Sequence, residues 1–235
     1  MQKIIHKAED RAYRDRGWVR SYFSFSFAEY FNAKMMGFGA LRVLNDDTIA
    51  PGEGFETHPH DNFEIMTVIL SGALKHKDSE GHESVIGKGG VQLISAGSGI
   101  SHSEFNASES EEVSLLQIWI EPNVRDAESR YQEGNFPTRN SQEKFTLVVA
   151  PGNGGNSLTI NQEAYVSLAS LGVGQEVVYE IKKEGNGVYV FIIDGEVSVE
   201  GEKIGRRDAV GLSVTDKVAI GATKEAQLIL FEVPM

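Results

Sequence analysis

Short apolar runs separated by turn residues recur along the whole chain. Phe23, Phe25 and Phe27 alternate with serines, which is the two-residue period of a half-buried strand. Further apolar runs predict strands at 40–44, 63–70, 91–94, 115–120, 145–149, 165–169, 188–193, 197–200, 218–220 and 228–233. Gly, Asn, Asp and Ser turns lie between these runs, so the pattern predicts an antiparallel barrel or sandwich.

One long segment, Glu121–Lys144, interrupts this pattern because it is polar, contains two prolines and has no sustained period. The length of 235 residues suits two compact domains of ~100–120 residues each. We therefore expect two β units, residues 1–133 and 134–235. Helix should be scarce, with at most short pieces near Asp126–Glu133.

Charge and composition narrow the classes of partner. The chain has 34 acidic and 22 basic side chains, and its net charge of -12 repels phosphate backbones and anionic membrane surfaces. No apolar run approaches the ~18 residues of a membrane span, and the charged N-terminus lacks the apolar core of a signal peptide. We expect a cytoplasmic protein that binds neither nucleic acid nor membranes directly. The absence of cysteine means that any metal must be bound through nitrogen and oxygen.

Two short motifs contain the candidate chemistry. His58 and His60 are two residues apart, as are His102 and Glu104. Residues with this spacing point to the same face of a strand. Two such pairs on neighbouring strands would converge on one point, and burying four ionisable groups together is costly without a cation. The sequence therefore predicts one divalent transition metal bound by these four side chains, although a single buried histidine is more often a hydrogen-bonded core residue.

Other ionisable residues are weaker candidates. Glu64 is six residues beyond His58 and shares its predicted face, so it is either a partner of the metal site or a carboxylate at the cavity edge that is paired elsewhere. His76 and His82 occur in the charged hairpin Lys75–Glu83, where we expect both to be solvated.

At these residues the chain resembles the cupin superfamily. The first cupin motif appears as Gly52, His58-Pro-His60, Glu64 and Gly72, and the second as Gly97-Ser-Gly99, His102 and Asn106. More specifically, the chain resembles the pirin family over most of residues 15–122. The matching stretches include Gly17-Trp18, Met36-Gly-Phe38, Leu41-Arg-Val-Leu-Asn-Asp-Asp47, Ser95-Ala-Gly97, His102-Ser-Glu104 and Gln117-Ile-Trp-Ile120.

The resemblance implies a bicupin, with two antiparallel jelly-roll β-barrels packed face to face. It also implies iron, held in the N-terminal barrel by His58, His60, His102 and Glu104. Fe(II) is the expected ion, and Mn, Co, Ni, Cu and Zn are the alternatives. Pirins do not usually use the residue that matches Glu64 as a ligand. The second half has no histidine, so its barrel is expected to lack a metal and to serve as a scaffold.

Bacterial pirins resemble quercetin 2,3-dioxygenases, which implies a flavonol and O2 as substrates. Glu104 is then expected to act both as a ligand and as the general base for the flavonol hydroxyl. Phe38, Met66 and Trp119 are candidates for the substrate pocket, with core packing as the simpler alternative for each. The rival function is a metal- or redox-dependent regulatory module that binds a protein partner.

Overall fold

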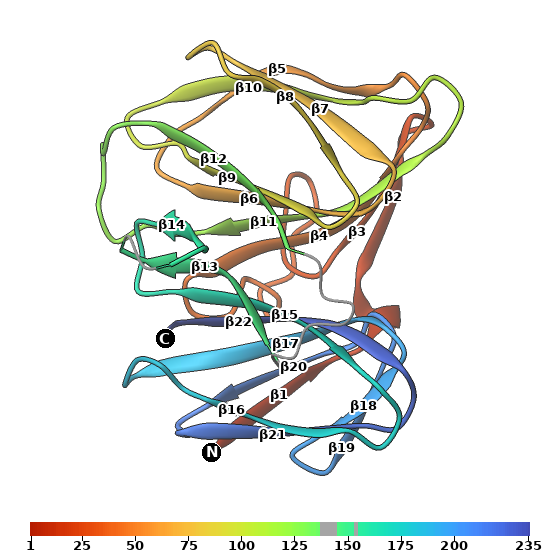
Figure 1. Cartoon of the computed structure of the whole chain (residues 1–235), viewed down its shortest axis with the longest axis vertical. Helices are drawn as coiled ribbons and strands as arrows, with labels where there is room; N and C mark the ends of the chain where they lie inside the picture. Colours follow the sequence, from red (N-terminus) through yellow and green to blue (C-terminus); the bar gives the residue numbers. More distant parts are fainter. Residues whose placement is uncertain (137–144, 153–154) are drawn as a thin grey trace.

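The computed structural model describes residues 1–136, 145–152 and 155–235. Almost all the regular structure in this part of the chain is β-strand, with one 3-10 turn at Ala8–Asp10 (η1). The strands form four sheets, in two halves stacked along the long axis of the molecule (Figure 1). The predicted all-β fold is therefore confirmed. Within the described residues, no helix has the length and hydropathy needed to cross a membrane.

The first half consists of a seven-stranded sheet, in the order β12-β9-β6-β11-β4-β3-β2, and a four-stranded sheet, in the order β5-β10-β7-β8. The strands are β2 Ala12–Asp15, β3 Val19–Phe23, β4 Leu41–Ile49, β5 Gly54–His60, β6 Glu64–Ser71, β7 Ala73–Asp78, β8 Glu83–Gly87, β9 Gly90–Ser95, β10 Ile100–Asn106, β11 Val113–Ile120 and β12 Arg130–Asn135.

The second half repeats this plan. Its sheets have the orders β1-β20-β17-β22-β15-β13-β14 and β16-β21-β18-β19, and the β13–β14 pair is parallel. The strands are β1 Gln2–His6, β13 Thr146–Pro151, β14 Leu158–Ile160, β15 Tyr165–Leu171, β16 Glu176–Glu180, β17 Asn186–Asp194, β18 Glu196–Val199, β19 Glu202–Gly205, β20 Ala209–Ser213, β21 Lys217–Ala222 and β22 Ala226–Pro234.

The two seven-stranded sheets face each other at the centre of the molecule, and the four-stranded sheets lie outside them (Figure 1). One continuous apolar cluster includes buried side chains of both halves, for example Phe38 and Leu44 with Tyr189 and Phe231. The rings of Phe38 and Tyr189 are 5.4 Å apart. Burial of apolar surface therefore joins the halves.

The N-terminal strand β1 crosses from the first half to the second. Its five residues pair with β20 from Gln2↔Ser213 to His6↔Ala209, and Lys7 Nζ lies 2.9 Å from Asp208 Oδ2. The division at residues 133/134 stays a prediction.

The structure corrects two local predictions. β3 ends at Phe23. Phe25 lies outside any strand, and its side chain belongs to the apolar cluster between the halves. Residues Arg130–Asn135 form strand β12 on the edge of β9 instead of a short helix, because the exposed edge of β9 offers backbone partners. The last part of the predicted linker, residues 137–144, lies outside the described residues.

An ion pair across the interface gives a stability prediction. Arg207 Nε donates to Asp46 Oδ2 at 2.7 Å, and the two side chains are only 14% and 11% exposed. We expect Arg207→Ala to lower the free energy of unfolding by about 1–3 kcal/mol, because Asp46 loses a largely buried donor. Arg11 Nη1 lies 3.3 Å from Asp46 Oδ2, so it remains as a second partner and limits the loss of stability.

Chemical denaturation of the full chain measures this difference. Arg206→Ala is the matched control, because Arg206 pairs with Asp194 at a site where both side chains are about two-thirds exposed. Its effect should stay within about 0.5 kcal/mol. Equal losses in the two variants would contradict a role for Arg207 in joining the halves.

Candidate metal centre

Antiparallel pairing of β5 with β10 brings the two histidine motifs together. His58 lies opposite His102 in the register, and Ile100 lies opposite His60. The ring centroids of the three histidines are 4.6–4.9 Å apart in all three pairs. The structure therefore brings together the three histidines that the sequence predicted, with ligand atoms close enough to share one ion.

Glu104 follows on β10, after a register shift between His102 and Glu104. Its carboxylate is 2% exposed and accepts hydrogen bonds from three side chains. Gln92 Nε2 donates to Oε1 at 2.7 Å, Thr67 Oγ1 to Oε1 at 3.2 Å, and Gln117 Nε2 to Oε2 at 3.0 Å. These donors come from β9, β6 and β11, so the seven-stranded sheet fixes the orientation of the carboxylate.

Ring nitrogens of the site histidines remain available to a cation, while His58 Nδ1 is engaged by the backbone oxygen of Glu56, 2.7 Å away. Burial, together with the neighbouring imidazoles, lowers the pKa of His102 to about 3 and that of His60 to about 4. Neutral imidazole is the form that binds metals. Neither ring nitrogen of buried His102 has a hydrogen-bond partner among the described residues. Imidazoles with free ring nitrogens next to a carboxylate fit a divalent transition metal.

His76 corrects the prediction that both hairpin histidines are solvated. It lies opposite Glu104 in the β7–β10 register and is fully buried, while the side chain of His82 is 46% exposed. His76 Nε2 lies 3.2 Å from Asp78 Oδ2, and its ring is 5.5 Å from that of His102. His76, His102 and Glu104 form a second group able to hold an ion. Alternation along β7, where His76 and Asp78 are buried between exposed lysines, was the signal for this placement.

Of the other predicted site residues, Trp119 lies at the histidines, whereas Glu64, Phe38 and Met66 have their contacts elsewhere. Glu64 is buried and accepts hydrogen bonds from Ser95 at 2.8 Å and Asn161 at 3.0 Å, so its partners lie away from the histidines. Phe38 and Met66 belong to the apolar cluster between the halves. Trp119 packs edge-on against His60, with centroids 4.9 Å apart.

A cavity of about 280 Å³ opens beside the histidines, close to the lower end of the ~300–1,000 Å³ range for small-molecule sites. Apolar atoms form most of its surface, although nine of the fifteen lining residues are polar or charged. The lining residues are Arg14, Arg16, Val19, Ser21, Phe23, Phe27, Ala28, Asn45, Asp47, Phe55, His58, His60, Glu104, Gln117 and Trp119.

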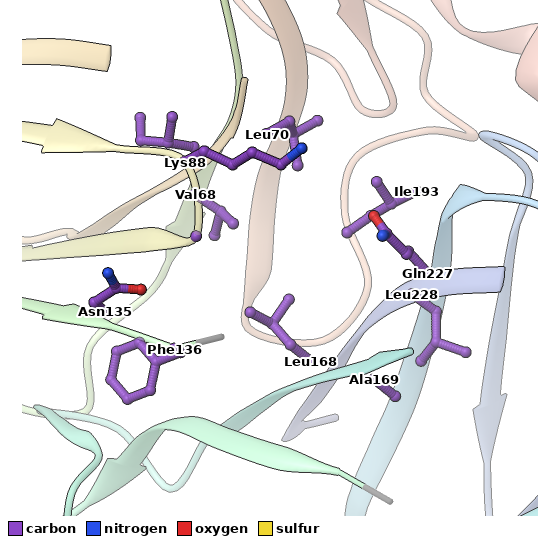
Figure 2. A pocket seen from close by; sticks show the side chains of 12 residues that line it. Val68, Leu70, Lys88, Asn135, Phe136, Leu168, Ala169, Ile193, Gln227 and Leu228 are labelled. Carbon is purple, nitrogen blue, oxygen red and sulfur yellow. The ribbon is translucent and has the colours of Figure 1, made fainter. Parts of the chain in front are cut away.

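A second cavity, of about 240 Å³, lies between the two halves (Figure 2). Val68 and Leu70 of β6 line one side, and Ile193 and Leu228 of the second half line the other. The described residues around it include no histidine, aspartate or glutamate. This cavity therefore lacks the groups needed for metal chemistry.

Comparisons with known sequences agree with this two-part organisation. The pirin family model matches residues 6–120, and the model of the quercetinase C-terminal cupin domain matches residues 147–233. A quercetin 2,3-dioxygenase of Escherichia coli K12 is 35% identical over 230 residues, covering 98% of both chains. A pirin-like protein of Caulobacter vibrioides is 37% identical over 219 residues, covering 93% of this chain and 94% of its own.

Solved structures show the same arrangement. The bacterial pirin YhhW of Escherichia coli, in complex with nickel(II), superposes with a TM-score of 0.94 at 34% identity and covers 99% of both chains. A Geobacillus kaustophilus protein with a TM-score of 0.83 is only 21% identical and shares the fold alone.

Proposed function

The chain belongs to the pirin family, and on that premise we propose that it is a metal-dependent dioxygenase of the quercetin 2,3-dioxygenase type, which opens a flavonol ring with O2. The observation that carries the proposal is the convergence of three imidazoles, with an oriented carboxylate beside them, next to a cavity whose surface is mostly apolar. His58, His60, His102 and Glu104 are the proposed ligands.

A divalent transition metal, with Fe(II) expected and Mn, Co, Ni, Cu or Zn as alternatives, would supply open positions for the substrate oxygen and, where redox-active, a partner for O2. The protein's own contribution is to position the substrate. Phe23, Phe55 and Trp119 offer flat apolar surfaces to an aromatic ring and exclude water from it. Arg14 adds positive charge to the cavity of a protein with net charge -12, which favours an ionised phenol, whereas Arg16 is already paired with Glu29 at 3.0 Å.

A turnover assay tests the proposal. Metal-free protein is loaded separately with Fe(II), Mn, Co, Ni, Cu and Zn, mixed with quercetin without oxygen, and then exposed to O2. We expect loss of flavonol absorbance and release of carbon monoxide with at least one metal. Metal-treated protein without His58 and His102 is the control for oxidation by free ions. Absence of turnover with every metal would refute the enzyme assignment.

One surface feature supports the regulatory module as a second candidate. A shallow hollow next to the cavity shares Phe27 and Trp119 with it, and Phe31 and Met36 at this hollow are 74% and 41% exposed. Exposed apolar side chains in a group are typical of protein contact sites. This candidate predicts that quercetin is not consumed with any metal.

A further inference from the structure

The strand β4 places two polar residues inside the metal cavity. Residues of β4 alternate, so that Leu44 and Asp46 face the second half while Asn45 and Asp47 line the cavity. Asn45 and Asp47 are both 3% exposed. In each, the side-chain oxygen Oδ1 has no hydrogen-bond partner among the described residues. A buried, unpartnered carboxylate oxygen destabilises the fold, so its retention on the wall of a cavity indicates a functional use.

Glu104 is poorly suited to accept a proton, although the sequence predicts it for that role. Both of its oxygens already accept hydrogen bonds, two from Thr67 and Gln92 and one from Gln117. These three donors leave neither oxygen of Glu104 free to face a substrate hydroxyl without giving up a hydrogen bond. The reaction therefore needs a proton acceptor with a free oxygen in the same cavity.

We propose that Asp47 is the catalytic base that removes the proton from the substrate hydroxyl. This inference rests on the proposed dioxygenase function. In the step, the O–H bond of the flavonol breaks, its proton forms a bond to a carboxylate oxygen of Asp47, and the electron pair stays on the substrate oxygen. No atom changes oxidation state. The proton returns to solvent when the product leaves as an anion, which restores the carboxylate.

The surroundings of Asp47 suit this role. Burial raises the pKa of Asp47 to about 7, the Ser21 hydroxyl opposes the rise, and the negative charges of Asp46 and Glu104 add to it. A base works best when its pKa lies near the working pH. The titratable or charged groups that share the cavity with Asp47 are Arg14 and Arg16 from the β2 side, His58 and His60 from β5, and Glu104 from β10. A bound cation would favour the ionised form of Asp47.

Asp47→Asn tests the proposal because it preserves size and removes the ability to accept a proton. We expect unchanged metal content, since Asp47 is outside both groups of candidate ligands. We expect kcat for quercetin to fall ~10²-fold or more, the usual scale for a general base. Asp47→Glu should recover part of the activity. Glu112→Gln is the control, because this exposed carboxylate pairs with Arg20 outside the cavity.

A second measurement does not depend on turnover. Flavonol is mixed with the metal-loaded protein without oxygen, and the rate at which the bound molecule ionises is followed by its absorbance from pH 5 to pH 9. In the parent protein, this rate should rise with pH as Asp47 loses its proton. In Asp47→Asn, the rate should fall ~10²-fold or more, and the rising limb of activity near pH 7 should disappear.

The outcomes separate this inference from the proposed function. If the parent consumes no quercetin with any metal, the dioxygenase proposal fails, and the ionisation rate of the bound flavonol alone decides the role of Asp47. Equal ionisation rates in parent and Asp47→Asn overturn the inference, as does equal kcat in an active protein. Loss of kcat in Glu104→Gln at unchanged metal content, with Asp47→Asn fully active, would assign the base to Glu104. Failure of flavonol to bind overturns both proposals.

Discussion

Replacement of both His58 and His102 by alanine is expected to abolish tight metal binding. Parent protein should hold about one ion per chain, and the double variant should hold less than about a tenth of that after gel filtration, since half of the proposed ligand set is gone. Both groups of candidate ligands contain His102. His102→Ala alone should therefore lower the metal content more than His58→Ala, which leaves His76, His102 and Glu104 in place.

Metal analysis of proteins loaded with one ion at a time measures the effect. His82→Ala is the matched control, because this half-exposed histidine lies outside both groups. Its metal content should equal that of the parent. Two tightly bound ions per chain, or full retention of metal in the double variant, would contradict the proposed ligand set.

Much of the candidate site could be predicted from strand parity alone. The two-residue spacing of the histidine motifs is a local property. It is enough to predict that His58 and His60 point to the same face of a strand. The contact between β5 and β10 needed only that the two strands be neighbours. The same spacing added Glu104 to His102, and the resemblance to pirins added the bicupin fold and iron as the expected ion.

The groups that hold or complement the ligands could not be predicted in the same way. Gln92, Thr67 and Gln117 meet Glu104 from three strands, and only the register of the completed sheets brings their side chains together. Asp47 was not among the residues predicted for the site, although its place in the strand is a local signal. It occupies an inward position of a strand whose other inward residues include Val43 and Ile49, which are fully apolar.

The pairing of the N-terminal strand was equally inaccessible from local pattern. Four of the five residues of β1 are exposed, and the strand has no clear apolar alternation. Its position depends on the free edge of β20, more than 200 residues away along the chain. Long-range pairing of this kind is decided by the tertiary structure, not by the propensity of the segment.

Removal of the second half is expected to have the largest effect on stability. A chain that ends at Glu133 loses β20, the partner of β1, and exposes the apolar face of the first half. Each large apolar side chain that is fully uncovered costs about 1.5–3 kcal/mol. A large exposed apolar patch also promotes association between chains. We expect the shortened chain to be aggregated or to unfold at a much lower temperature than the parent, as measured by light scattering and thermal denaturation.

A point variant in the full chain tests the same interface without removing a domain. Phe38 packs on Tyr189 and lies so close to Gly187 and Gly211 that a Cβ at either glycine would come within 3 Å of its ring. Phe38→Ala should therefore lower the free energy of unfolding by about 3–5 kcal/mol, because no neighbouring side chain fills the space. Phe31→Ala, at a phenylalanine that is 74% exposed, is the matched control and should change stability by less than about 0.5 kcal/mol.

A shortened chain that stays monomeric, stable and fully active, with Phe38→Ala as stable as the control, would show that the first half does not need the second.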